Sequence, residues 1–279
     1  MSEGERDAAL HDPAGGPSKL WLTPAAAAIA VLGSMAGIGG GLFTGPLLAI
    51  VYGFALRRAV ATALGVVLVN ALLSTATEMA NPDGRILWGV AAAMAAGALL
   101  GAQIGIHVAR RLDERRLRQV FVVVLALAGT RVVVDACSNG ASVAEGSGAI
   151  APIGYAIALI AGLLGGTASP VLGIGGGLVM VPTVYLLLPG AGFAEARACS
   201  LAVIVVTAAR SLWLHARDGR VSWACVAWLA PGAALGGVVG ARLVHRDGLD
   251  LVGQVILGLV LWLVAVLFTI QLRRSRRTA

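Results

Sequence analysis

The chain has 279 residues, of which 58% are hydrophobic and 13% are charged, and its mean hydropathy is +0.87. Soluble domains carry about 25% charged residues, so this composition excludes an ordinary soluble enzyme. Several apolar runs approach the roughly 20 residues that cross a bilayer as a helix. The net charge of +7 does not indicate a nucleic-acid partner, because the arginines lie in short loops and at the C-terminus rather than in a basic groove lined with aromatic side chains.

Residues 1–19 are polar and lack the basic start and apolar core of a signal peptide, so we expect a disordered cytoplasmic tail there. Eight apolar segments follow in two sets of four, and the first segment of each set is interrupted by glycines. The first transmembrane repeat, 20–134, is expected to hold segments 21–52, 60–79, 86–108 and 118–134. After an extracytoplasmic linker, 135–149, the second repeat, 150–272, is expected to hold segments 150–188, 198–216, 221–244 and 249–271, followed by a basic cytoplasmic tail, 273–279.

The glycine interruptions are part of a duplication. Gly37–Gly41 and Gly173–Gly177 have the same sequence, Gly-Ile-Gly-Gly-Gly, and each is followed five residues later by a proline, Pro46 or Pro182. The Asp-Gly-Arg of 83–85 recurs at 218–220, and glycines four residues apart recur in the third segment of each set. Such spacing is typical of a helix-packing face in lipid. Matches in this number and order indicate two copies of one unit.

The distribution of Lys and Arg predicts how the copies cross the membrane. If every segment crossed once, nine basic residues would lie on each side, which gives no bias. If each broken segment enters and returns on the same side, fifteen lie inside and only Arg85, Arg197 and Arg246 lie outside, as the positive-inside rule requires. We therefore expect an all-α integral membrane protein, a polytopic helical bundle of two inverted repeats, each with one glycine-broken helix and three continuous helices, and both termini in the cytoplasm.

Each glycine cluster precedes a short apolar helix, at 42–52 or 178–188, about 16 Å long. Its N-terminus would lie deep in the bilayer, where non-helical backbone must be enclosed by protein or line a polar cavity. Free amides and the positive end of the helix dipole would then attract an anion. Packing alone is the alternative reading of these glycines. The substrate-binding candidates at the two breaks are Gly37, Gly39, Gly40, Gly41, Pro46, Gly173, Gly175, Gly176, Gly177 and Pro182.

Three side chains within the predicted helices complete the substrate-binding candidates. Arg210 would guide an anion through the membrane, or extend its long side chain to the interface. Asn70 and Thr207 occupy equivalent places after the two breaks, where they would bond substrate oxygens or a neighbouring helix. Glu78 and His215 are also equivalent, and we expect both at membrane interfaces. With no Asp or Glu near a predicted midplane, a carboxylate proton relay is not expected.

The doubled Gly-x-Gly-Gly-Gly-x4-Pro motif, the stretches Arg58–Thr62 and Arg197–Ser200, and the two Asp-Gly-Arg loops resemble the sulfite exporter TauE/SafE family of membrane permeases. The resemblance covers nearly the whole chain after residue 20. It implies a bacterial inner-membrane permease that moves sulfite, organosulfonates or related sulfur-containing anions, usually outward. It places the family motif on the two glycine clusters and their prolines, and it does not identify the substrate.

We therefore expect a multi-pass permease that exports a small anion by alternating access, with the lipid bilayer and the anion as its partners. A passive anion channel, an importer of another small organic anion and a structural membrane subunit stay open as alternatives, as does the oligomeric state. An enzyme is not expected, because the four His form no HExxH and the three Cys form no CxxC. For the same reason we expect no cofactor and no metal site. A nucleic-acid partner is not expected because the arginines form no basic groove.

Overall fold

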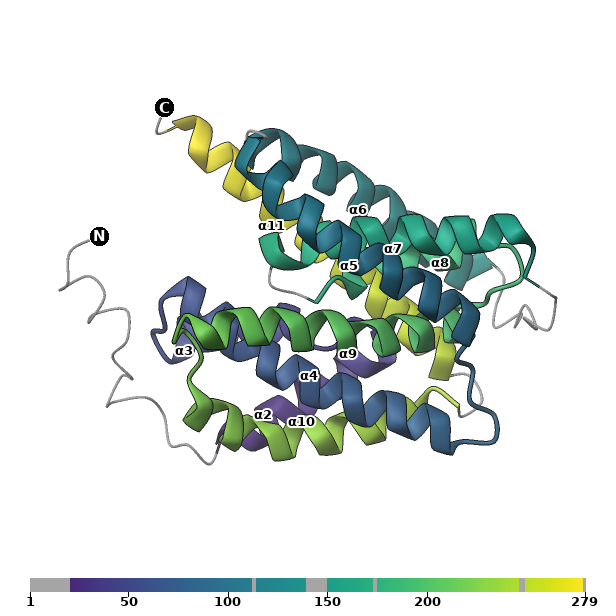
Figure 1. Ribbon diagram of the computed structural model, residues 1–279, viewed down its shortest axis with the longest axis horizontal. Coiled ribbons are helices and arrows are strands. Elements are labelled where there is room, and N and C mark those ends of the chain that lie inside the picture. The colour runs from purple at the N-terminus through teal and green to yellow at the C-terminus, as the bar shows by residue number, and fades with distance from the viewer. Residues whose placement is uncertain (1–20, 112–113, 139–149, 173–174, 246–248, 278–279) are drawn as a thin grey trace.

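The computed structural model describes residues 21–111, 114–138, 150–172, 175–245 and 249–277. These residues form ten helices, drawn in Figure 1. The first half of the chain contains α2 (Leu22–Ala36), α3 (Gly41–Val51), α4 (Leu56–Ala80), α5 (Trp88–Arg111) and α6 (Glu114–Ser138). The second half contains α7 (Pro152–Leu172), α8 (Gly177–Leu187), α9 (Phe193–Arg217), α10 (Trp223–Leu243) and α11 (Leu249–Arg277).

The all-helical prediction is confirmed, and the two breaks fall at the glycine clusters. Two helices run further than expected: α6 ends at Ser138, inside the predicted linker, and α11 continues to Arg277, inside the predicted basic tail. The predicted N-terminal tail and the rest of the linker lie outside the described residues.

The surface is that of a membrane protein. Among the described residues, three helices are long and apolar enough to cross a bilayer, at Arg57–Ala80, Phe193–Arg217 and Trp223–Leu243, and shorter apolar helices make up most of the remainder. Large apolar side chains are exposed along the helices, and all six tryptophans of the chain are among them. Exposed apolar surface on this scale is unfavourable in water and suits contact with lipid.

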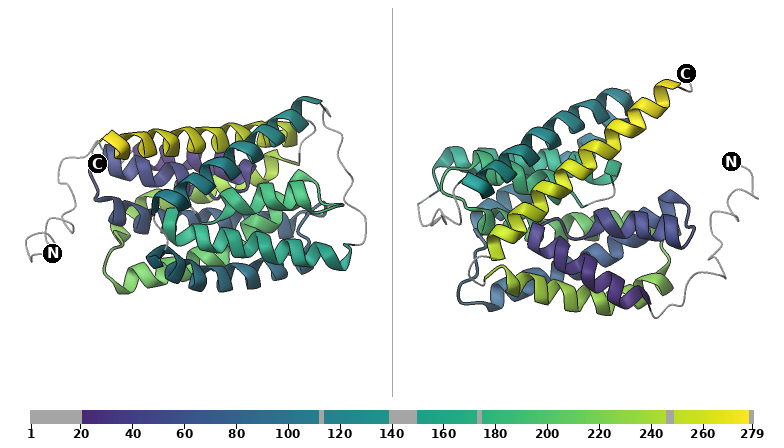
Figure 2. Two further views of the ribbon diagram at one scale, coloured as in Figure 1. Left: turned by 90° about the horizontal axis from the view of Figure 1, so that it is seen from above. Right: turned by 180° about the vertical axis from the view of Figure 1, so that it is seen from behind.

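At both breaks the chain reverses, because consecutive glycines adopt backbone angles that other residues rarely reach. Gly39 and Gly40 have φ of 72° and 79°, and the amides of residues 38 and 39 donate to the carbonyl of Gly33. A side chain on Gly33 would overlap the backbone of Gly40, because a Cβ there would collide with the amide nitrogen of Gly40. This close approach lets α3 return beside α2 (Figure 2). In the second half, Gly176 (φ 84°) packs on Gly165 of α7 in the same way, so α8 returns along α7.

The third segment of each half, α5 or α10, packs on the first helix of the other half. Helix α5 lies against α7, α10 lies against α2, and α6 pairs with α11. Glycines make the first two contacts close, as their four-residue spacing predicts. A Cβ on Gly97 or Gly101 would overlap carbonyl oxygens of α7, and one on Gly232 or Gly236 would overlap carbonyl oxygens of α2.

Helices α4 and α9 form the central contact between the two halves. Their facing surfaces bury a small apolar cluster of Val67, Ala71, Leu201, Ile204 and Ala208. One separate apolar core gathers α2, α3, α4 and α10, and a larger one gathers α5 to α9 with α11. The α4–α9 seam therefore joins two packed bodies, each of which contains helices from both halves of the chain.

Candidate functional site

The two glycine breaks meet at the centre of the molecule. A Cβ on Gly177 would lie 2.7 Å from the carbonyl oxygen of Gly37. Added Cβ atoms on Gly39 and Gly175 would both lie within 3.1–3.4 Å of the same two side chains, Val67 of α4 and Ile204 of α9. The structure thus brings the predicted glycines of the two halves together, and in this conformation apolar side chains pack between them.

The short helices that follow the breaks keep the positive ends of their dipoles free of acidic side chains. The N-cap residues are Gly40 and Gly176, neither helix has a side-chain cap, and neither has an acidic residue in its first turn. The amides of residues 43 and 44 donate to the carbonyl of Gly40, and those of 179 and 180 donate to the carbonyl of Gly176. Both ends therefore keep the partial positive charge of a helix N-terminus. Gly41 begins α3 and is buried.

The remaining predicted positions at the breaks are less alike. Pro46 lies within α3 and is exposed, whereas Pro182 lies within α8 and is buried. Each lacks an amide hydrogen and so cannot donate to the carbonyl four residues earlier. Gly173 lies outside the described residues.

A pocket lies beside the second break, between α5, α7 and α9. Its polar residues are Ser169, Thr207, Arg210 and Ser211, and its other walls are small or apolar. Thr207 Oγ1 donates to the carbonyl oxygen of Gly175 at 3.2 Å, which ties the pocket to the break. The hydroxyl of Ser169 is buried and has no hydrogen-bond partner among the described residues. The pocket is lined by Ala98, Leu99, Ala102, Gly166, Ser169, Thr207, Arg210, Ser211 and Leu214.

Arg210 supplies the positive charge of this pocket. Its side chain is half-buried, and within the described part of the chain it has no carboxylate partner. Of the residues predicted from sequence, the structure therefore brings Arg210 and Thr207 together. Sequence reasoning did not select Ser169 and Ser211, because isolated serines in apolar helices carry no distinguishing pattern.

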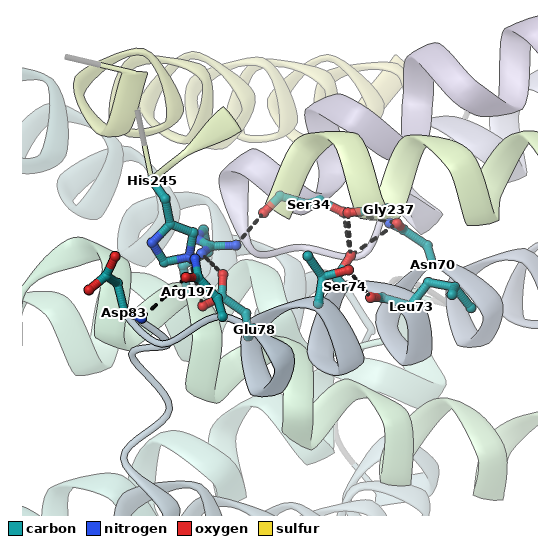
Figure 3. A network of polar contacts seen from close by, with 11 residues as sticks. Ser34, Asn70, Leu73, Ser74, Glu78, Asp83, Arg197, Gly237 and His245 are labelled. Atoms are coloured by element: carbon teal, nitrogen blue, oxygen red, sulfur yellow. Dashed lines mark hydrogen bonds and ion pairs between the residues drawn. The ribbon is translucent and has the colours of Figure 1, made fainter. Parts of the chain in front are cut away.

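Asn70, the equivalent of Thr207 in the first half, has a different environment. Its Oδ1 accepts a hydrogen bond from Ser34 Oγ of α2 at 2.9 Å, and Ser34 Oγ lies 2.6 Å from Ser74 Oγ. Ser74 in turn donates to the carbonyl oxygen of Gly237 in α10 at 3.2 Å. Figure 3 shows this chain of hydrogen bonds across three helices. Asn70 therefore bonds a neighbouring helix, as one of its two predicted roles required.

The hydrogen-bond chain continues into a buried charge cluster that the sequence did not reveal. Glu78 near the end of α4 and Arg197 near the start of α9 form an ion pair, and both side chains are fully buried. His245, just after α10, lies 3.0 Å from the second oxygen of Glu78 through Nε2. Arg197 Nη1 also donates to the carbonyl oxygen of Ser34 at 3.4 Å. Figure 3 shows the three side chains converging from separate elements.

The side chain of Glu78 is fully buried although it lies near the end of α4, and its place at a membrane interface stays a prediction. Three elements end at the same place, so the carboxylate finds a cation and an imidazole inside the protein instead of water. A carboxylate in an otherwise apolar helix was the available signal. No signal in the sequence indicated its partners, Arg197 and His245, because they lie 119 and 167 residues away in the chain.

Known proteins match the chain at the level of the family. A family model described as Sulfite exporter TauE/SafE matches residues 4–132 and 158–279. A "Probable membrane transporter protein" of Haemophilus influenzae is 33% identical over 113 residues, which cover 38% of this chain and 43% of that protein. "Probable membrane transporter protein YunE" of Bacillus subtilis is 26% identical over 107 residues, 38% of each protein.

These matches span less than half the length of the curated relatives. No solved structure matches the chain. The family match, in contrast, extends over both halves of the chain and includes both breaks, except for the segment between residues 132 and 158. The chain therefore belongs to the sulfite exporter TauE/SafE family, whose members are multi-pass membrane transporters rather than enzymes.

Proposed function

We propose that this chain is a bacterial inner-membrane permease that exports small sulfur-containing anions, such as sulfite or organosulfonates, by alternating access. The observation that carries the proposal is the pocket beside the second break. There Arg210 supplies an unneutralised cation at a mostly apolar wall, and the buried hydroxyl of Ser169 has no partner among the described residues.

The chemistry of the pocket suits an oxyanion. A guanidinium presents several N–H donors in one plane and binds anions with two or more oxygens in a bidentate manner. Ser169 and Ser211 each add a hydroxyl donor, and a buried donor without a partner gains most from a ligand acceptor. Thr207 has its single hydroxyl hydrogen directed to backbone carbonyls. It therefore positions the break rather than donating to the anion.

Inverted repeats are supported by the way the helices exchange partners. The contact of α5 with α7 has its counterpart in the contact of α10 with α2. Helices α4 and α9 are the equivalent second segments of the two halves, and they contact each other. Helices α5 and α10 begin at opposite ends of the molecule, as do α2 and α7 (Figure 1). Two copies inserted in opposite directions would have this arrangement, and the distribution of basic residues between the loops supports cytoplasmic positions for both termini.

An alternating-access carrier is favoured over an open channel because the two ends of the α4–α9 seam differ. The Arg210 end has a pocket, whereas the Asn70 end is filled by hydrogen bonds between α2, α4 and α10. With the basic loops inside, the pocket belongs to the cytoplasmic half. The inside-negative potential then favours anion exit by about 2.3 kcal/mol per charge per 100 mV.

Anion flux from proteoliposomes containing the purified chain tests the proposal. We expect saturable efflux of sulfite or a sulfonate that is accelerated by an inside-negative potential and that exchanges with external anion. Thiosulfate and small carboxylates complete the panel. Flux without saturation or exchange would instead indicate a channel. Uptake against the potential that depends on a proton gradient would contradict export, and a folded chain that moves no anion of the panel would contradict the permease.

A further inference from the structure

The two ends of α9 carry arginines in contrasting surroundings. Arg210 lines the pocket and is half-buried, whereas Arg197 is fully buried and paired with Glu78. The two residues are thirteen positions apart, about 20 Å along a helix. The pocket and the buried charge cluster therefore lie on opposite sides of the glycine breaks.

The charge cluster binds together the elements that would have to separate if the molecule opened at that end. Arg197 joins α9 to α4 through Glu78 and to the end of α2 through the carbonyl of Ser34. Ser200, one turn later, donates to the carbonyl of Gly37 at 2.9 Å, within the first break. His245 adds the segment after α10.

The other half of the chain cannot form the same closure. Arg197 has a counterpart in the first half, because Arg58-Ala59 matches Arg197-Ala198. At the 137-residue spacing that relates Asn70 to Thr207, however, the equivalent of Glu78 is His215, so the carboxylate of the pair is missing. Ser34 corresponds to Pro170 at the spacing of the breaks. The buried ion pair and the first hydroxyl of the hydrogen-bond chain thus have no counterpart at the end where the pocket lies.

We propose that Glu78, Arg197 and His245 form the gate that closes the extracytoplasmic end of the permeation path. This inference rests on the proposed transport function and names the residues that keep one face shut while the Arg210 pocket faces the other side. Glu78 occupies the anion-binding groups of Arg197 in the closed state, so the guanidinium becomes available to a departing anion only when the gate opens.

The buried ion pair holds the gate closed, and unsatisfied hydrogen-bond donors beside it weaken the closed state. A buried ion pair holds its partners because separating them inside the protein would leave uncompensated charges. At the same time, Arg197 Nε and Asn70 Nδ2 are buried without partners among the described residues, and such unsatisfied donors weaken a buried network. Removing one member of the pair should therefore favour the state in which water or an anion reaches the other.

Reaction of a cysteine at Ser74 with a membrane-impermeant thiol reagent, added outside right-side-out vesicles, tests the gate. We expect Glu78→Gln and Arg197→Gln each to raise the labelling rate of Ser74→Cys at least about tenfold. Glu78→Gln leaves the buried guanidinium of Arg197 without a counter-ion, and Arg197→Gln leaves the carboxylate of Glu78 with His245 alone. The double variant, which removes both charges, should label more slowly than either single variant. Parents without Ser74→Cys correct for the native cysteines, and size-exclusion chromatography confirms folding.

Glu195→Gln is the matched control. Glu195 is itself buried and pairs with Arg85 at 3.1 Å near the same end of the molecule, but 37% of the Arg85 side chain is exposed. The cation that Glu195→Gln leaves behind therefore stays in contact with solvent, and labelling should be unchanged. Equal labelling in the Glu78→Gln, Arg197→Gln and Glu195→Gln variants would overturn the gate. Anion flux of the wild-type chain in proteoliposomes is measured separately. A wild type that moves no anion refutes the permease, whereas labelling alone decides the gate.

Discussion

Replacement of Gly37 by alanine should destabilise the protein more than the same replacement at Gly53. Both glycines have a positive φ, 74° and 66°, so alanine meets a similar backbone cost, roughly 1–2 kcal/mol, at either position. No heavy atom lies within 4 Å of a Cβ built on Gly53. A Cβ on Gly37 would lie 2.9 Å from Arg197 Cγ and Val181 Cγ2, and 3.0 Å from Arg197 Cα.

The difference between the two variants comes from this crowding. The Cα of Arg197 belongs to the backbone of α9 and cannot move aside like the end of a flexible side chain. Forcing an extra methyl group into a packed site costs about 1–3 kcal/mol, which we take as the excess for Gly37→Ala over Gly53→Ala. For a chain of this size the excess corresponds to a Tm lower by roughly 2–10 °C.

Thermal unfolding of the purified variants in one detergent, followed by tryptophan fluorescence, measures this excess. The added substitution Val181→Ala removes one of the contacts and should restore part of the lost Tm in the Gly37→Ala background. If Gly37→Ala and Gly53→Ala lower the Tm equally, backbone strain alone accounts for the effect, and the close approach of the first break to Arg197 is refuted.

Three further substitutions probe the pocket and the helix contacts. Arg210→Ala should raise the KM for the transported anion on the order of tenfold to a hundredfold, whereas Arg220→Ala in the loop between α9 and α10 should leave it unchanged; equal KM values in both would exclude Arg210 from the site. Ser169→Ala removes a buried hydroxyl that has no partner among the described residues. The free energy of unfolding should therefore stay the same or rise by up to about 1 kcal/mol, while the affinity for the anion falls. A lower Tm with unchanged affinity would contradict this role. Gly232→Ala should separate α10 from α2 and cost about 1–3 kcal/mol, but Gly45→Ala, in open space within α3, should be neutral or stabilising; similar Tm values would refute close packing at Gly232.

The broken helices were predictable because their cause is local. Consecutive glycines within an apolar segment permit a reversal that no other residue type makes at low cost, and the duplication showed that the reversal occurs twice. Glycines four residues apart similarly indicated the close contacts of α5 and α10, because a side chain of any size prevents backbones from touching.

The contents of the centre were not predictable in this way. Val67 and Ile204 are two among many apolar residues of α4 and α9, and nothing in the sequence distinguishes the side chains that meet at the breaks from those that face lipid. Glu78 was expected at a membrane interface, and its partners depend on which helix ends come together. That information arises from the packing of α4, α9 and α10 and is not contained in any one of them.

Duplication gives the two halves similar backbones, so differences between their side chains determine which end of the molecule is closed. Asn70, Ser74 and Ser34 close one end through hydrogen bonds, whereas Thr207 and Ser211 at the equivalent places line a pocket. For the proposed inverted repeats, two states with interchanged backbones would have nearly equal energies if the sequences were identical. The buried pair at one end removes that balance. An anion that binds at Arg210 and then reaches Arg197 would lower the cost of opening that end, which couples gate opening to the presence of cargo.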